Sequence, residues 1–175
     1  SATPRIYDDG DYCELNSNYK MTYKLSFNEA LKSKHICDYK LFFPDFGSDG
    51  NVERIEYSCS MKKIDKDVIG KIDFLNSGFQ SLGFKKCIAY FEDTKALRLF
   101  EKNYAKVRKD EWFNDVQVFV IVSGTRAKER KRIMKEFNDI PNRCIILSVR
   151  ILDEGIDIVA CDSIYFTYMT SNKIK

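Results

Sequence analysis

Three short apolar runs of this 175-residue sequence are each followed directly by small polar or charged residues. The polar stretches are residues 92–94, 123–125 and 148–157. Hydroxyl groups, glycine backbone and the free amides of a helix start suit phosphate oxygens, because their donors point outward and the helix dipole favours negative charge. If the apolar runs are parallel strands, the polar stretches share the sheet edge where ligands of open α/β sheets bind. The pattern therefore predicts a groove that tracks a phosphate backbone, although any single stretch would be read as a helix cap.

A basic segment follows the second polar stretch. Its charged residues are Arg126, Lys128, Arg130, Lys131, Arg132 and Lys135, with Glu129 and Glu136. On charge alone, the plain interpretation is a solvated helix face. Cations in a first helical turn, here Arg126 and Lys128, oppose the helix dipole, and a bound polyanion would offset that penalty. Both interpretations stay open.

Hydrophobic periodicity predicts the elements that position these stretches. We expect strands at 39–43, 87–91, 116–122, 143–147 and about 163–166, and helices at 26–34, 65–82, from 94 onward and at 126–137. The helix at 126–137 should face inward with Ala127, Met134 and Phe137. Residues 8–11 look irregular. Short apolar strands that alternate with helices indicate βαβ units, and hence an α/β fold whose mostly parallel sheet is covered on both faces.

Composition bounds the class of protein. With 44% hydrophobic and 31% charged residues, the chain has the make-up of a soluble globular domain. No apolar run reaches the ~20 residues that span a bilayer, and there is no signal-peptide layout, so we expect no membrane partner. The net charge of +3 permits nucleic-acid contact but does not argue for it. Six cysteines without a CxxC pair, and a single histidine, predict reduced thiols, no metal site and a soluble intracellular protein.

Taken together, these segments resemble the second RecA-like lobe of superfamily 2 (DEAD/DEAH-like) helicases. Residues 1–4 (Ser-Ala-Thr-Pro) resemble the family's third motif, and residues 87–94 its fourth. Residues 123–130 resemble an element usually written His-Gly, Gln, Arg, with Ser123 in place of the His and Lys128 in place of the Gln. Residues 149–157 resemble the fifth motif, and their Glu-Gly-Ile-Asp ending is closest to the excision-repair and type III restriction branch.

The resemblance implies a three-layer RecA-like fold and a role for each matching residue. Nucleotide contact, to the ATP ribose and across the lobe junction, is implied for Gly155 and Asp157. Nucleic-acid contact is implied for Thr94, Ser123, Gly124, Thr125, Lys128, Val149 and Arg150. Coupling of hydrolysis to movement is implied for Ser1 and Thr3. No catalytic residue and no metal ligand is expected within the chain itself.

The resemblance also implies a domain layout and a function. Residues 1–25 would hold the end of the first lobe and the interlobe linker, and residues 26–175 the second lobe, ending before the arginine-finger motif. The function implied is the C-terminal lobe of an ATP-dependent nucleic-acid helicase or translocase, whose partners are DNA or RNA and the first lobe. ATP and magnesium would bind the full-length protein. We expect the chain alone to lack ATPase activity, because it holds no Gly-rich loop ending in Lys-Ser or Lys-Thr.

Two other interpretations remain. One is a non-catalytic RecA-like module that binds a protein or nucleic acid without forming an ATP site. The other is an unrelated α/β enzyme of flavodoxin-like topology, because a fold pattern does not fix a function. The turn-like sequence at Asp49-Gly50 has no role in any of these interpretations.

Overall fold

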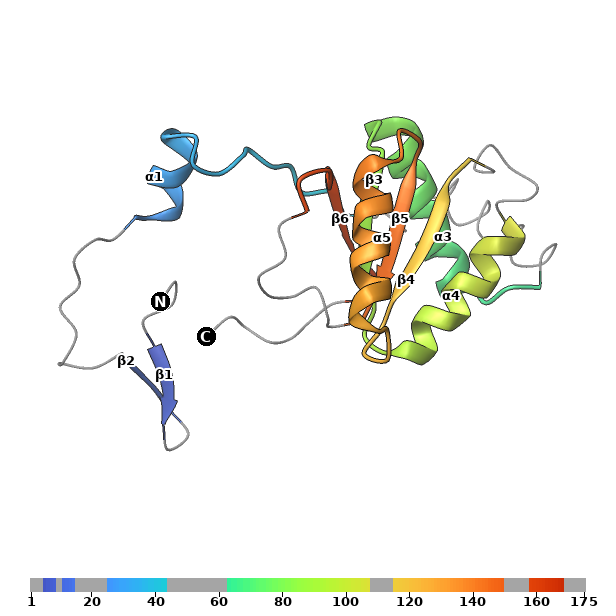
Figure 1. Cartoon of the computed structure of the whole chain (residues 1–175), viewed down its shortest axis with the longest axis horizontal. Helices are drawn as coiled ribbons and strands as arrows, with labels where there is room; N and C mark the ends of the chain where they lie inside the picture. The colour runs from blue at the N-terminus through green and yellow to red at the C-terminus, as the bar shows by residue number, and fades with distance from the viewer. Residues whose placement is uncertain are drawn as a thin grey trace. The chain divides into compact units, whose positions relative to one another are not determined.

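Four parallel strands form the central sheet, and their order is β4-β5-β3-β6 (Figure 1). They are β3 (Lys86–Tyr90), β4 (Gln117–Ile121), β5 (Cys144–Ser148) and β6 (Ser163–Phe166). The computed structural model describes residues 25–43, 63–107, 115–149 and 158–168, together with the main chain of 5–8 and 11–14. The sheet lies in the unit Pro44–Met169; residues Ser1–Phe43 and Thr170–Lys175 form the other unit. The predicted boundary after residue 25 stays a prediction.

The two central strands, β5 and β3, are buried on both faces because they are almost wholly apolar. Every residue of β5 is buried, and β3 is buried from Lys86 to Ala89. Ile145 and Leu147 face one side of the sheet, whereas Cys144 and Ile146 face the other. Continuous apolar runs of this kind are typical of parallel strands covered by helices. The predicted α/β fold with a parallel sheet is confirmed.

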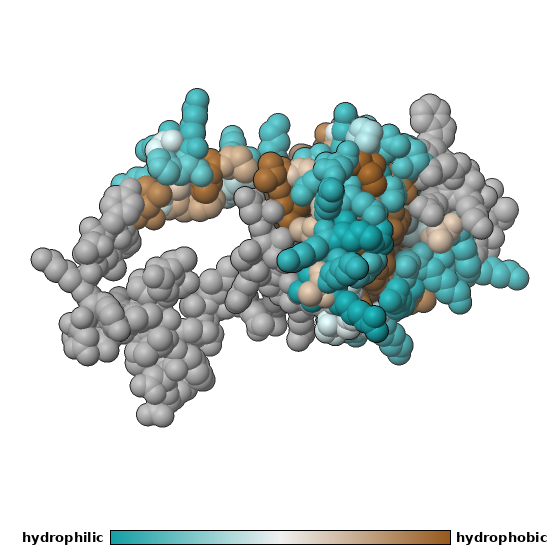
Figure 2. All heavy atoms as spheres, viewed as in Figure 1, coloured by the Kyte–Doolittle hydropathy of each residue, from teal (hydrophilic) through white to brown (hydrophobic). Residues whose placement is uncertain are grey.

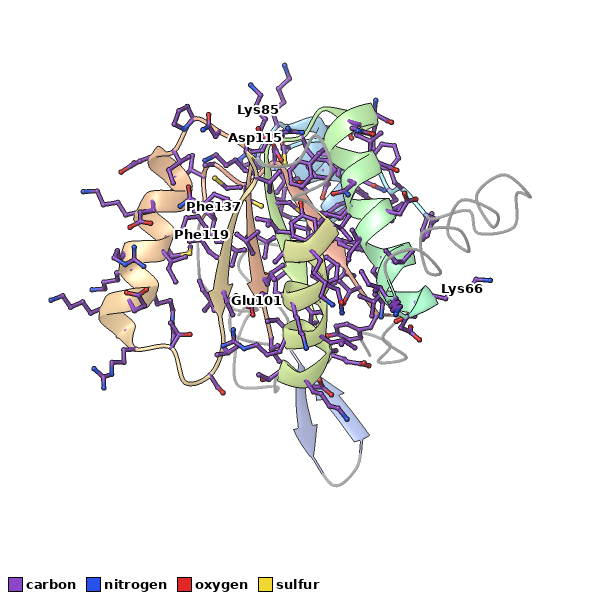
Figure 3. The ribbon with its side chains drawn as sticks, turned by 90° about the vertical axis from the view of Figure 1, so that its right-hand side faces the viewer. Lys66, Lys85, Glu101, Asp115, Phe119 and Phe137 are labelled. Atoms are coloured by element: carbon purple, nitrogen blue, oxygen red, sulfur yellow. The ribbon has the colours of Figure 1, made fainter. Side chains whose placement is uncertain are left out.

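Helices cover both faces and complete three layers (Figure 3). Helix α3 (Lys66–Ser77) and helix α4 (Thr94–Val107) pack on one face through a core that includes Ile72 and Phe100. Helix α5 (Ala127–Asp139) packs on the opposite face through Ile133 and Phe137. In Figure 3 the labelled Phe119 and Phe137 meet between α5 and the sheet.

Two glycines shape the connection from α3 into β3. The helix predicted at 65–82 is present, but its last turn, η1 (Gly78–Leu82), is π-helical. A Cβ on Gly78 would lie 2.1 Å from Cε1 of Phe84, so only glycine lets this ring pack against the helix. Gly83 has a φ of +71°, the left-handed conformation that ends helices and that glycine adopts without strain.

The inner face of α5 differs from the prediction. Ile133 and Phe137 are buried and Met134 is half-buried, but Ala127 is exposed. At 3.6 residues per turn, Ala127 lies roughly 120° around the helix from Ile133, which places it on the flank. Ile133, which we did not predict to face inward, belongs to the centre of this face because it stands four residues before Phe137.

The N-terminal unit contains a hairpin and a short helix. Strands β1 (Arg5–Asp8) and β2 (Asp11–Glu14) pair antiparallel, so Asp8 and Asp11, which we expected to be irregular, belong to strands. Residues 9–10 lie outside the described residues. Helix α1 (Phe27–Lys32) is confirmed with its capping box: the Glu29 N–H donates to Ser26 Oγ at 3.2 Å, and the Ser26 N–H donates to Glu29 Oε2 at 2.8 Å.

The prediction of a strand at residues 39–43 is wrong. These residues belong to no strand and are exposed, and Phe43 is 82% exposed. Their aromatic and apolar composition fits a pleated surface, but strand propensity takes effect only where a neighbouring strand is available to pair.

No helix among the described residues is long and apolar enough to cross a membrane.

A candidate phosphate-binding site at the carboxyl ends of the strands

All four strands end at the same level. The register pairs Tyr90 with Ser148 and with Phe166, and it pairs Ser148 with Ile121. The turns that follow β4, β5 and β3 therefore leave the sheet side by side, at the lower edge of the sheet in Figure 1. The prediction that the polar stretches share one edge is confirmed for every residue of them that the structure describes, namely 92–94, 123–125, Ser148 and Val149.

The turn after β4 is held by its own threonine. Thr125 Oγ1 accepts a hydrogen bond from the Val122 N–H at 2.9 Å, and the Thr125 N–H donates to the Val122 carbonyl at 2.8 Å. This pair of bonds fixes the turn and presents Ser123 and Gly124, both exposed, toward solvent. The acceptor side of the Thr125 hydroxyl is in use, but its proton remains able to donate to an anion.

Open space surrounds Gly124. A Cβ built on this residue would meet no protein atom within 4 Å, so packing within the protein does not require a glycine here. A glycine in open space allows another molecule to approach the backbone closely. This is the geometry expected of a backbone that binds phosphate.

Arg130 supports the same turn from helix α5. Its Nη2 donates to the Thr125 carbonyl at 3.3 Å. Its Nε is buried and has no hydrogen-bond partner among the described residues. The sequence marked Arg130 as part of the basic segment and of a family element, and the structure shows that it contacts the main chain of the turn.

The two helix starts at this edge differ in how they are capped. Asp93 Oδ1 accepts from the Ala96 N–H at 2.7 Å, so a carboxylate already occupies the start of α4 beside the exposed Thr94. Asp93 is therefore the cap of α4. Arg126, the N-cap of α5, makes no side-chain capping bond. The first amides of α5 therefore lack the side-chain acceptor that usually satisfies them, which favours an anion at this end.

The last residues of β5 lie deeper than the sequence suggested. Ser148 is fully buried, and its Oγ has no hydrogen-bond partner among the described residues. Val149 is half-buried, and its side chain packs against the core beneath α3 and α4. A contact of Val149 with nucleic acid would therefore use its main chain.

Metal ligands and thiols are the other groups at which a site could form. Within them, no group of three or more His, Cys, Asp or Glu residues could hold a metal ion. The cysteines Cys37, Cys87, Cys144 and Cys161 are free thiols. Burial raises the pKa of Cys87 to about 12, so this thiol is neutral at physiological pH. Cys87 and Cys144 pack in the core as small apolar side chains.

Five of the predicted site residues lie outside the described part of the chain. They are Ser1, Thr3, Arg150, Gly155 and Asp157. The structure therefore brings together Thr94, Ser123, Gly124, Thr125 and Val149 at one edge, with Lys128 in the first turn of α5. The roles of all these residues stay predictions.

Comparison with known protein families identifies the family of this chain. The family model of the helicase conserved C-terminal domain matches residues 70–174, which is more than half of the 175 residues. The chain belongs to this family. This confirms the resemblance to the C-terminal lobe of helicases. The finer assignment to the excision-repair and type III restriction branch stays a prediction.

Solved structures similar to this helicase lobe include two ATPase domains. The C-terminal part of the Fun30 ATPase domain is 16% identical with a TM-score of 0.48, and the match covers 69% of this chain and 41% of that one. The Sulfolobus solfataricus SWI2/SNF2 ATPase C-terminal domain is 16% identical with a TM-score of 0.44, covering 57% and 41%. The matches thus span 41% of the length of each of these structures. No curated protein matches the chain.

Proposed function

We propose that this helicase lobe binds the sugar–phosphate backbone of one nucleic-acid strand along the level ends of β4, β5 and β3. The observation that carries the proposal is the turn at Ser123-Gly124, which stands in open space beside the uncapped start of α5. Hydroxyl and amide donors at this edge would contact phosphate oxygens and not the edges of bases, so binding should be independent of the nucleic-acid sequence. Lys128 and the main chain of Val149 extend the same contact.

The other half of the proposal concerns ATP. We infer that Gly155 and Asp157 contact the nucleotide in the full-length protein, where the first RecA-like lobe supplies magnesium and phosphate binding. Arg150 would contact nucleic acid, and Ser1 and Thr3 would couple hydrolysis to movement. By this proposal the chain alone binds no ATP firmly and turns none over. Turnover by the isolated chain, stimulated by DNA or RNA, would contradict it.

We call the edge that carries residues 92–94, 123–125, Ser148 and Val149 the rim. Backbone binding is tested with two rim variants of the full-length protein, Ser123→Ala and Gly124→Ala. Affinity for a labelled single strand is measured by fluorescence anisotropy between 50 and 200 mM salt. We expect several-fold weaker binding in both variants, whatever the sequence of the oligonucleotide. Neither variant removes a charge, so the slope of log K against log salt should stay close to that of wild type.

The matched control for this test is Ser81→Ala. Ser81 is an exposed serine in η1, which leads into the start of β3 and so lies at the opposite edge of the sheet. Thermal unfolding should be unchanged for Gly124→Ala, because a Cβ there meets no protein atom. Wild-type affinity in both rim variants, or equal losses in Ser81→Ala, would overturn the proposal.

The nucleotide half is tested with Asp157→Ala and Arg150→Ala in the full-length protein. The first should reduce ATP turnover with and without nucleic acid. The second should leave basal turnover in place and remove its stimulation by nucleic acid. Unchanged turnover and unchanged stimulation in both variants would refute these two roles, and the lobe would then be a non-catalytic binding module.

A further inference from the structure

The excess charge of the chain is concentrated in one helix. Residues 126–139 hold six Lys and Arg against three Asp and Glu, a net charge of +3. The whole chain also has a net charge of +3, so the remaining residues balance to zero. A local basic stripe, rather than overall charge, is the usual electrostatic footprint of nucleic-acid binding.

The lysines of α5 form a stripe on its outer side. Lys128, Lys131 and Lys135 follow each other at spacings of three and four residues and are all exposed. At 100° per residue, these three lie roughly opposite the buried Ile133 and Phe137. In Figure 2 hydrophilic side chains gather over α5, the helix that faces the viewer in Figure 1.

Two of the three acidic residues of the segment, Glu129 and Glu136, are engaged beside this stripe, whereas the third, Asp139, is exposed and follows Lys135 by four residues. Arg132 Nη2 pairs with Glu129 Oε1 at 2.5 Å, and Arg132 Nη1 pairs with Glu136. Two carboxylates are thus used by a single arginine on the neighbouring flank. Lys128, Lys131 and Lys135 have no ion pair with any described residue. Like charges at these spacings repel, and a bound polyanion would relieve the repulsion.

The stripe leads away from the rim. Helix α5 starts beside Ser123–Thr125 and runs back toward the amino ends of the strands, so Lys128 lies near the rim and Lys135 lies farther along. The seven helical steps from Lys128 to Lys135 span about 10 Å at 1.5 Å per residue. A nucleic-acid strand that follows the rim runs across the sheet and does not follow α5. In a duplex, the second strand lies across a groove about 6–12 Å wide, and its backbone could follow α5.

We propose that Lys131 and Lys135 bind phosphates of the second strand of a duplex whose first strand lies along the rim. Lys128 stands where the two paths meet. This inference rests on the proposed backbone binding at the rim and adds the class of nucleic acid that the lobe accepts. Contacts to phosphate make the interaction independent of sequence and sensitive to salt.

The test compares single-stranded and duplex oligonucleotides of equal length with the full-length protein. In Lys131→Gln/Lys135→Gln, duplex affinity at 100 mM salt should fall about tenfold, and the slope of log K against log salt should become shallower by up to about 2. Single-strand affinity should stay within about twofold of wild type. The control is Lys102→Gln/Lys106→Gln on α4, two exposed lysines at the same spacing on the opposite face of the sheet. This control should bind duplex like wild type.

The outcomes separate this inference from the proposed function. Wild-type duplex affinity and salt slope in the α5 variant would overturn the second-strand contact, and the stripe would then be a solvated face or a surface for an acidic protein. Equal losses on single strand and duplex would also overturn it, because one strand would then contact both surfaces. Rim variants that bind single strands normally would instead overturn the proposed function.

Discussion

The hydroxyl of Thr125 and the main-chain N–H of Val122 form a 2.9 Å hydrogen bond that closes the turn after β4. The Thr125 N–H donates back to the Val122 carbonyl at 2.8 Å. The family element at this position thus contains one residue that builds the turn and two, Ser123 and Gly124, that face solvent. We therefore expect the three neighbouring residues to respond differently to substitution.

Thr125→Val should remove the bond to Val122 while keeping the shape of the side chain. Loss of one such bond should lower the free energy of unfolding by about 1 kcal/mol, and it should weaken single-strand binding because the turn loses its fixed geometry. Urea unfolding and fluorescence anisotropy measure the two effects. Thr125→Ser keeps the hydroxyl and should restore both. If valine changed binding but left stability unchanged, the hydroxyl would be a ligand contact and not the element that holds the turn.

Lys86 performs a structural task that its sequence position does not reveal. It is buried on β3, and its Nζ donates to the carbonyls of Phe137 and Ile140 at the end of α5, 5.3 Å from the centroid of the Phe137 ring. An ammonium group here satisfies carbonyls that the helix leaves unpaired and interacts favourably with the helix dipole.

Lys86→Met should therefore destabilise the lobe by about 2–3 kcal/mol, because charge-assisted hydrogen bonds are lost and buried carbonyls are left unpaired. The midpoint of urea unfolding measures this. Lys85→Met is the matched control, since the adjacent Lys85 is exposed and its main chain, not its side chain, makes the hydrogen bonds to Asp162 Oδ2 and from the Cys144 N–H. Equal midpoints for the two variants would show that Lys86 does not hold the end of α5.

The sequence predicted the elements whose signal is local. The strands at 87–91, 116–122 and 143–147 appear as β3, β4 and β5, because short, mostly apolar runs suit buried parallel strands. The capping box at Ser26 and the helix end at Gly83 were also predictable, because each depends on residue types within a few positions of the helix end. The hairpin β1-β2 was missed although Asp9-Gly10, a common hairpin pair, stands between its strands.

Features that depend on tertiary neighbours were not predictable. Residues 39–43 have the composition of a strand but pair with none, and Ser148 looked like part of an exposed loop but is buried at the end of β5. The sequence placed Thr125 among the phosphate contacts, but the bond from Val122 is visible only in three dimensions. The polar edge itself was predictable, because parallel strands must deliver their carboxyl ends to one side.

The repulsion within the α5 stripe has a consequence for stability. Without nucleic acid, Lys131→Gln/Lys135→Gln should leave the lobe as stable as wild type or more stable by up to about 0.5 kcal/mol, since the like-charge pairs at spacings of three (Lys128–Lys131) and four residues (Lys131–Lys135) are removed. Thermal unfolding at low salt measures the gain, and about 0.5 M salt should reduce it by screening. A clear loss of stability would mean that these lysines hold partners of their own, which would contradict their assignment to a free phosphate-binding surface.

Thiol reactivity should separate Cys37 from the strand cysteines. Cys37 is exposed, whereas burial raises the pKa of Cys87 to about 12 and raises that of Cys144 above its usual range. Since the thiolate is the reactive form, brief iodoacetamide treatment of the native chain at pH 8 should alkylate Cys37 and leave Cys87 and Cys144 unmodified until denaturant is added. Mass spectrometry of the proteolytic peptides reads out each site.

The same burial sets the direction of a pH effect. Because the folded pKa of Cys87 lies above the usual value of 9.0, the folded state keeps a proton that the unfolded chain loses. The stabilisation from the neutral thiol is therefore complete below pH 9 and is lost as the pH rises from about 9 toward 12. Cys87→Ala should show a shallower decrease in stability over this interval than wild type, although it is less stable at pH 7 because it leaves a small cavity in the core. Equal slopes for the two proteins above pH 9 would show that Cys87 is accessible to water.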